Sequence, residues 1–339
     1  MLCERQTAGP YVYCENSPVS FKSTGFVRGC GHGCLFEDLN GNLWKVQTND
    51  ISINHQFERR ISIYPAKIIN NRLYVNTLRT DYPMLYPLDN VDPFNKPDVG
   101  WQLFSYGKTA AASSTLDEHH TPNLAADECM ATWWCAKTGD KGEWISLDLE
   151  KEYDISAVQI NFADQGVSKE KGGREYCTGY QYILEYSLDG ETWQILVDRS
   201  ENTKDMPHDY VQLEKEICLR YLKLTNLGEI PAGGLFAVSG LRVFGPACGE
   251  PVEHAPEFAV ERCEDQRDMN VRIKRVCGAQ GYIIRLGIAP DELYTHYTIA
   301  EDSLLDSVRI GCLNNGVKYY VAVDAYNEAG IVKGNVILV

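Results

Sequence analysis

Short runs of alternating apolar and polar residues are the feature that most constrains the fold of this chain. The run W-I-S-L-D-L at residues 144–149 alternates at every position, and I-S-A-V-Q-I-N-F follows at residues 155–162. A β-strand turns successive side chains to opposite faces, so a period of two predicts strands that bury one face. Such runs recur along the whole chain, and the sequence therefore predicts an all-β protein.

Turn dipeptides separate these runs. Asn40-Gly41 lies between the alternating residues 35–39 and 43–47, and Asp189-Gly190 interrupts the run from residue 180 to residue 196. Asn-Gly and Asp-Gly favour the two-residue turns of β-hairpins because both residues tolerate a positive φ. Asn70-Asn71 predicts a third turn. The first ninety residues are thus expected to form consecutive antiparallel strands of one sheet.

The length and charge of the chain bound its class. A chain of 339 residues predicts two or three domains, and 44% hydrophobic residues are enough for folded cores. The formal net charge of -15 repels phosphate backbones, so we expect no nucleic-acid partner. No apolar run approaches the ~18 residues of a membrane span. The start of the chain lacks a signal peptide, which favours the cytoplasm if Met1 is the true start and a secreted or periplasmic location if the chain is a fragment.

Twelve cysteines are scattered through all regions without a recurring C-x-x-C pattern. Cys30, His32 and Cys34 have the residue types of zinc ligands, but their spacing does not match the usual zinc knuckles. We therefore expect free, mostly buried thiols in a reducing compartment, with disulfides as the open alternative.

Two connectors divide the chain. Pro83, Pro87, Pro93 and Pro97 punctuate the first, and proline cannot donate to a strand ladder. The second, G-P-A-C-G-E-P-V-E-H-A-P, begins at residue 245. The expected domains are residues 1–90, 101–246 and 257–339, joined by linkers at 91–100 and 247–256.

The middle region resembles the C-terminal module of coagulation factors 5 and 8, the discoidin-like domain related to carbohydrate-binding module family 32. The motifs that carry the resemblance lie in the family's order: A-S-S-T, N-L-A-A-D-E-C-M-A-T-W-W, W-I-S-L-D-L, E-Y-S-L-D-G-E-T-W, R-Y-L-K-L and S-G-L-R-V-F-G. The resemblance implies a jelly-roll β-sandwich that binds its ligand in loops at one end. Trp134 and Trp144 are expected in the core, whereas Trp133 occupies a position that is often polar in the family and is expected to be exposed.

The same resemblance implies a calcium ion. Family members hold it with carbonyls, an Asp and a Thr, and the matching positions here are Asp127 and Thr132, with the carbonyls of Ala126 and Cys129. Oxygen ligands of this kind suit calcium. Gly240 stands where the family often has a glutamate, which removes one carboxylate from the set.

Other loop residues are candidates for glycan contact. Imidazoles at His119 and His120 are able to bond sugar hydroxyls, and the loop at residues 167–176 carries Arg174 as a donor and Tyr176 as a stacking face. Together with Trp133 these are the predicted glycan-binding residues. The alternative is that the histidines are solvated and that Arg174 and Tyr176 belong to an ordinary charged loop.

The two ends of the chain resemble other families. The pattern Y-Y-V-A-V-D-A-Y-N-E-A-G at residues 319–330 is similar to a fibronectin type III domain, in which Tyr319 would bond its hydroxyl back to the backbone. The N-terminal ninety residues resemble the end of a glycoside hydrolase family 43 β-propeller, on T-G-F-V-R-G-C-G-H-G, F-E-D-L-N-G-N-L-W, I-S-I-N-H-Q-F-E-R-R and D-Y-P. This resemblance places His32 in the axial channel and either Arg59 or Arg60 on the wall of a sugar pocket.

The catalytic groups of such an enzyme are not expected in this chain. An inverting glycosidase needs two carboxyl groups, and in the family these belong to earlier blades. A five-bladed propeller needs more than about 200 residues at roughly 45 per blade. We therefore predict the C-terminal, glycan-binding part of a hydrolase acting on arabinose- or xylose-containing polysaccharide, inactive alone. The alternative is a non-enzymatic carbohydrate-binding or adhesion protein built from β-sandwich modules.

A lone terminal blade also exposes strand edges. We expect it to be held by the middle module or by another chain, through self-association or the missing part of the propeller.

Overall fold

The computed structural model describes residues 2–3, 11–54, 59–84, 92–96, 99–167, 179–230, 233–301, 304 and 306–339. These residues form strands and one short 3₁₀ helix, η1 (Pro122–Ala125), so the predicted all-β fold is confirmed. The chain divides into two compact units. Unit 1 comprises Met1–Asp50, Arg59–Gly100 and Cys248–Val339, and unit 2 comprises Ile51–Glu58 and Trp101–Ala247. No helix in the described ranges is long and apolar enough to span a membrane.

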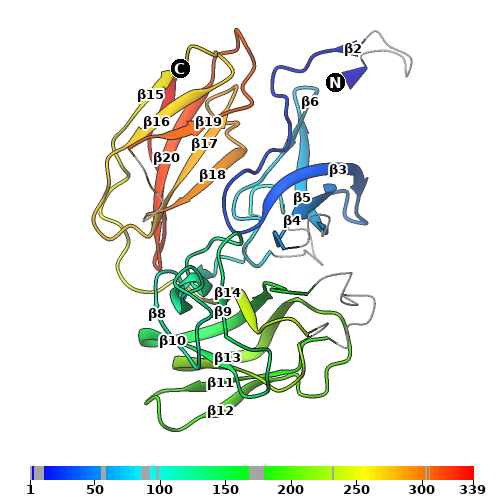
Figure 1. Ribbon diagram of the computed structural model, residues 1–339. Helices are drawn as coiled ribbons and strands as arrows, with labels where there is room; N and C mark the ends of the chain where they lie inside the picture. Colours follow the sequence, from blue (N-terminus) through cyan, green and yellow to red (C-terminus); the bar gives the residue numbers. More distant parts are fainter. Residues whose placement is uncertain are drawn as a thin grey trace. The chain divides into compact units, whose positions relative to one another are not determined.

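Unit 2 is built around one long pair of antiparallel strands. β10 (Trp144–Phe162) pairs with β13 (His208–Asn226), and Figure 1 shows the two strands side by side. Their register shifts twice, and such bulges bend a strand pair. The other strands of the sheet flank this pair: β7 (Gln102–Leu103), β8 (Thr109–Ala112), β9 (Trp134–Cys135), β11 (Tyr182–Ser187), β12 (Gln194–Asp198) and β14 (Ala237–Gly245).

The alternation seen in the sequence decides which side chains of β10 are buried. Ile145, Leu147 and Leu149 are all 0% exposed, and the residues between them are not fully buried. Burying one such side chain contributes about 1.5–3 kcal/mol. Trp134 is also 0% exposed, as predicted for a core residue, whereas Trp144 is only half-buried.

Unit 1 begins with an N-terminal sheet of four antiparallel strands in chain order. These are β3 (Arg28–Glu37), β4 (Leu43–Asp50), β5 (Arg59–Ile69) and β6 (Arg72–Val75). Asn70 and Asn71 have φ of 51° and 62°, so they form the predicted turn between β5 and β6. Further toward the N-terminus, β1 (Leu2–Cys3) pairs with β2 (Tyr11–Val12).

The β3–β4 turn is fixed by Asp38. Its carboxylate accepts hydrogen bonds from the indole N–H of Trp44 at 2.8 Å and from the backbone N–H groups of Asn40 and Asn42 at 2.9 Å. The bond from Trp44, followed by those from Asn42 and Asn40, outweighs desolvation and lowers the pKa of Asp38 to about 2. The turn predicted at Asn40-Gly41 is therefore confirmed, with Gly41 at a φ of 80°.

The C-terminal part of unit 1 is a β-sandwich. One sheet contains β15 (Phe258–Arg262), β16 (Met269–Ile273) and β19 (Val308–Ile310). The other contains β17 (Gly281–Gly287), β18 (Thr295–Ala300), β20 (Tyr320–Asn327), β21 (Gly330–Val332) and β22 (Val336–Leu338). The hydroxyl of Tyr319 accepts the backbone N–H of Asn314 at 2.9 Å, which is the contact predicted for this tyrosine.

Residues 15–26, which we call the strap, join the C-terminal sandwich to the N-terminal sheet within unit 1. On the sandwich side, the Asn314 amide donates to the carbonyl oxygens of Glu15 and Ser17, both at 2.7 Å. The ring of Phe21 lies 5.8 Å from that of Tyr297 and packs against the sandwich core.

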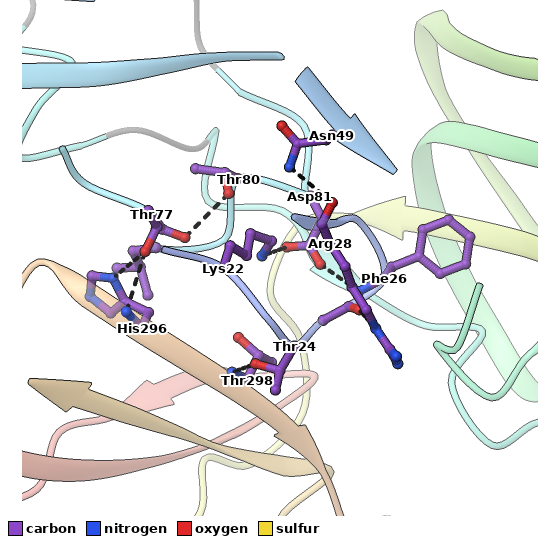
Figure 2. Close-up of polar contacts among 12 residues, drawn as sticks. Lys22, Thr24, Phe26, Arg28, Asn49, Thr77, Thr80, Asp81, His296 and Thr298 are labelled. Atoms are coloured by element: carbon purple, nitrogen blue, oxygen red, sulfur yellow. Dashed lines mark hydrogen bonds and ion pairs between the residues drawn. The ribbon is translucent and has the colours of Figure 1, made fainter. Parts of the chain in front are cut away.

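On the sheet side, the strap is fixed by buried polar contacts. Ser20 donates to the side-chain oxygen of Gln47 at 2.8 Å. Lys22 and Asp81 form an ion pair at 3.2 Å in which each side chain is 2% exposed, and Asp81 also accepts the backbone N–H of Phe26 at 2.8 Å. Figure 2 shows the contacts of Lys22 and Phe26 meeting at Asp81.

The edge strand β18 of the sandwich forms hydrogen bonds with the strap and with the segment that follows β6. The backbone N–H groups of His296 and Thr298 donate to the hydroxyls of Thr77 at 3.2 Å and Thr24 at 2.9 Å (Figure 2). The backbone N–H of Thr77 donates to the carbonyl of Tyr294 at 3.3 Å. Side chains thus occupy an edge that would otherwise be open to pairing. Packing of the N-terminal sheet on the C-terminal sandwich was not expected from the sequence, which favoured the middle module or another chain.

The cysteines differ from the expectation of mostly buried thiols. Of the described cysteines, all nine that can be classified are free, and Cys135 alone among them is buried. Burial raises the pKa of the Cys135 thiol to about 12, so it stays protonated at neutral pH. Cys34, Cys218, Cys277 and Cys312 are exposed.

Candidate functional site

The candidate site lies in the loop of unit 2 that follows β8. Asp117 Oδ1 accepts the backbone N–H of His119 at 2.9 Å and lies 2.6 Å from Nδ1 of His120. The side chain of Asp117 thus accepts a hydrogen bond from the backbone two residues on and forms an Asx turn, which aspartate favours. The backbone N–H of Cys135 donates to the carbonyl of His120 at 3.3 Å, which ties this loop to β9.

The ionised state of Asp117 decides which atom carries the proton in this contact. The hydrogen bond from His120, helped by the backbone bond of His119, lowers the pKa of Asp117. An ionised carboxylate accepts hydrogen bonds but cannot donate one. The proton in the 2.6 Å contact therefore belongs to Nδ1 of His120, and in the neutral ring Nε2 is an acceptor.

Trp133 stands beside this histidine. The two ring centroids are 5.3 Å apart at an interplanar angle of 53°. Trp133 is half-buried and packs against a small cluster of Cys135, Ala163 and Ala237, so the expectation of an exposed side chain is only partly met. Its indole nitrogen is buried without a hydrogen-bond partner in the described part of the chain.

The other predicted glycan-binding residues are not held in place as His120 is, or lie outside the described part of the chain. The side chain of His119 is 81% exposed and lies 3.7 Å from a carboxylate oxygen of Glu118, as a solvated histidine would. Arg174 and Tyr176 lie outside the described residues. The structure therefore brings together His120 and Trp133, and it adds Asp117, which the sequence analysis missed. The signal was present in D-E-H-H, where an acid precedes a histidine by three residues in a loop.

Glu143 is a second residue that sequence reasoning missed. Its carboxylate accepts the hydroxyl of Ser114 at 2.9 Å on both oxygens, the hydroxyl of Thr138 at 2.9 Å, and the hydroxyl of Ser113. Burial acts to raise the pKa of Glu143, but the hydrogen bonds from Ser113, Thr138 and Ser114 together lower it. This carboxylate holds the start of the loop in place.

The loop predicted to bind calcium brings together oxygen atoms of Asp127, Cys129 and Thr132, three of its four predicted ligand residues. Asp127 accepts the N–H of Cys129 at 2.9 Å and the hydroxyl of Thr132 at 2.6 Å, and that hydroxyl lies 3.0 Å from the carbonyl oxygen of Cys129. Calcium binds oxygen at about 2.3–2.6 Å, which places neighbouring ligand atoms about 3 Å apart. The carbonyl of Ala126 accepts the N–H of Gly107 at 2.8 Å. The residues have the oxygen donor types that calcium takes, but Asp127, Thr132 and Cys129 are joined here by hydrogen bonds, so calcium at this loop stays a prediction.

The neighbouring acid in this loop has a different partner. Both carboxylate oxygens of Glu128 accept from the guanidinium of Arg242, at 2.7 and 3.0 Å, and the Arg242 side chain is 2% exposed. Arg242 also donates to Gln159 at 2.8 Å. Because Glu128 is neutralised and Gly240 has no side chain, the loop offers little charge to a cation.

The predicted pocket residues of the N-terminal sheet lie on β3 and β5. His32 is exposed, with a φ of 33° at a point where the β3–β4 register shifts. Arg60 is half-buried and pairs with Asn49 of β4. Arg59 pairs with Asp50, and its side chain is outside the described residues. Neighbouring strand residues face opposite sides, so which arginine faces a pocket stays a prediction.

Cys30, His32 and Cys34 have the residue types of zinc ligands. Cys30 has no described side chain, and Cys34 is exposed. Across the described ranges, no group of three or more His, Cys, Asp or Glu side chains could hold a metal ion.

Comparison with known proteins places one family on the middle of the chain. The model for the F5/8 type C domain matches residues 109–238, and no curated protein matches the sequence. This range contains Asp117, His120, Trp133 and the loop at Asp127.

Several solved carbohydrate-binding modules are similar to part of this chain. Chitosan-binding module 1 of a Paenibacillus sp. IK-5 chitosanase/glucanase is 18% identical, covers 42% of this chain and 99% of its own, and has a TM-score of 0.36. The family 32 module of C. perfringens NanJ, in complex with galactose, is 16% identical over 43% and 99%, with a TM-score of 0.35. Chitosan-binding module 2 of the Paenibacillus enzyme, in complex with chitotriose, is 22% identical over 42% and 99%, with a TM-score of 0.35.

Proposed function

We propose that this chain, whose residues 109–238 form an F5/8 type C domain, binds glycan through the loop that carries Asp117 and His120. The observation that carries the proposal is the oriented histidine beside an indole ring. Asp117 holds Nδ1 of His120 at 2.6 Å, and the Trp133 ring lies 5.3 Å from that imidazole.

The chemistry of this arrangement suits a sugar. Sugar rings present hydroxyl groups at their edges and C–H groups on their faces. A ligand site needs a few fixed polar groups among apolar or aromatic walls. A histidine whose tautomer is set supplies one fixed polar group, and an indole supplies an apolar surface.

We further propose that the chain is the C-terminal part of a glycoside hydrolase family 43-like enzyme acting on arabinose- or xylose-containing polysaccharide. The four-stranded antiparallel N-terminal sheet supports this, because a propeller blade is a sheet of four strands. His32 and one of Arg59 and Arg60 would then contribute to a sugar pocket completed by other blades. The C-terminal sandwich, with its Tyr319 contact, would be a fibronectin type III domain.

Calcium in the loop at Asp127 is part of the proposal. Asp127, Thr132 and the carbonyls of Ala126 and Cys129 would hold the ion, whose role would be to fix the loop. With one carboxylate among the ligands, affinity is expected to be low, since calcium affinity rises with the number of charged ligands.

A glycan panel tests the proposed function. It should contain arabino- and xylo-oligosaccharides, galactose and chitotriose, and be measured by calorimetry with the full chain. We expect the wild type to bind at least one neutral glycan and His120→Ala to lose that binding. His254→Ala, an exposed histidine of unit 1, is the matched control and should bind as the wild type does. Binding that survives His120→Ala places the site elsewhere, and no binding to any glycan favours a structural or adhesion role.

A further inference from the structure

We infer that Asp117 is a positioning residue that decides which hydrogen-bonding group His120 presents to a ligand. The inference rests on the proposed function for its ligand but on the structure for its geometry. Asp117 is itself held, because its Oδ1 also accepts the backbone N–H of His119 at 2.9 Å. The carboxylate therefore does not depend on His120 for its position.

Two contacts hold the imidazole of His120, and a third holds its backbone. Nδ1 faces Asp117 at 2.6 Å, the Trp133 ring lies 5.3 Å away, and the carbonyl of the same residue is bonded to the N–H of Cys135 at 3.3 Å. The side chain is 19% exposed, so part of the ring still meets solvent. A ring held at Nδ1 has Nε2 as its remaining polar atom.

The tautomer of His120 determines whether Nε2 binds a ligand group that donates a hydrogen bond or one that accepts it. In free neutral histidine the Nε2–H tautomer predominates, which would make Nε2 a donor. A carboxylate at Nδ1 reverses this and makes Nε2 an acceptor. An acceptor fits a sugar hydroxyl or amine that donates. The carboxylate of a uronic acid only accepts, and the Asp117 carboxylate beside the ring repels its charge.

Asp117 is therefore a specificity-determining residue that selects neutral or amino sugars over acidic ones. Its removal should turn His120 from an acceptor into a donor without removing the imidazole. Removing a residue that only supports the fold would disturb the module as a whole. Removing Asp117 should change the tautomer of the His120 ring and leave the rest of the module as it was.

Nitrogen-15 NMR of histidine-labelled full-length protein above pH 7.5 measures the tautomer without any ligand. We expect the His120 signals of the wild type to show a protonated Nδ1 and an unprotonated Nε2. Asp117→Ala should move them toward the Nε2–H form. Asp117→Asn keeps an oxygen that accepts from Nδ1 and should keep the wild-type pattern, which guards against a merely unfolded variant. Glu191→Ala, an exposed acid in the β11–β12 turn, is the matched control.

Calorimetry of the same variants then tests the role in binding. For the glycan that the wild type binds best, Asp117→Ala should weaken affinity about tenfold and Asp117→Asn by less than about threefold, as expected for one lost hydrogen bond. Galacturonic acid should bind more weakly than galactose to the wild type. A wild-type His120 in the Nε2–H form overturns the inference, as does an Asp117→Ala variant with a changed tautomer and unchanged affinity. A wild type that binds no sugar contradicts the proposed function instead, and the tautomer still decides whether Asp117 positions the ring.

Discussion

The buried ion pair between Lys22 and Asp81 gives the sharpest test of how unit 1 is held together. Both side chains are 2% exposed, and the Nζ to Oδ1 distance is 3.2 Å. Asp81→Ala leaves the ammonium of Lys22 buried without its partner and removes the acceptor of the Phe26 N–H, which is 2.8 Å away. Removing one partner of a buried pair typically costs about 3–5 kcal/mol.

The expected change in melting temperature follows from this cost. For a unit of 150–250 residues, each kcal/mol lowers Tm by roughly 2–4 °C. Asp81→Ala should therefore lower the Tm of unit 1 by about 6–20 °C. Changing the pair together, as Lys22→Met with Asp81→Asn, should recover part of this loss, because no uncompensated charge is then buried.

Differential scanning calorimetry of the full chain separates the units. We expect two transitions, of which Asp81→Ala lowers only that of unit 1. Asp265→Ala breaks an exposed ion pair of unit 1 with Arg267 and should leave Tm nearly unchanged. A fall of less than about 3 °C for Asp81→Ala, or independent melting of the N-terminal sheet and the C-terminal sandwich, would refute the reasoning.

Three further predictions follow from the same structure. His296 is buried, and desolvation, with the nearby charges of Arg285 and Lys22, lowers its pKa from 6.5 to about 3. A histidine with a depressed folded-state pKa contributes stability above pH 6.5 that is lost as pH falls. Unit 1 should thus lose about 1.4 kcal/mol per pH unit between pH 6.5 and 3 from this group. In urea unfolding, His296→Gln should reduce the dependence of the free energy of unfolding on pH across that window, and an unchanged dependence would show that another group is the source. Calcium at millimolar concentration should raise the Tm of unit 2 and EDTA reverse it, with no response in Asp127→Ala; equal responses of the two proteins would place the ion elsewhere. The chain alone should not hydrolyse chromogenic arabinosides or xylosides, and turnover abolished by changing His32 would show that the catalytic groups are present after all.

Local features of the fold were predictable because they depend on neighbouring residues. The alternation at Ile145, Leu147 and Leu149 and the turns at Asn40-Gly41 and Asn70-Asn71 each need only a few residues of context. The packing of the N-terminal sheet on the C-terminal sandwich was not predictable in this way. Thr77 and His296 are separated by 219 residues, and the sequence around neither residue predicts their contact.

The candidate site was partly predictable for the same reason. His120 and Trp133 were named as residue types able to contact a sugar, but their ring contact depends on how β9 meets the loop after β8. Asp117 was missed because its role exists only in relation to His120. Glu128 illustrates the converse: an acid in a presumed calcium loop is paired with Arg242, more than a hundred positions away.

Glycan binding by the full chain, with and without His120, tests the central claim most directly. Calorimetry should show that the wild type binds at least one neutral sugar of the panel and that His120→Ala binds it at least tenfold more weakly while melting at the same temperature. Undiminished binding by a folded His120→Ala variant, or no binding by the wild type to any sugar of the panel, would contradict the account.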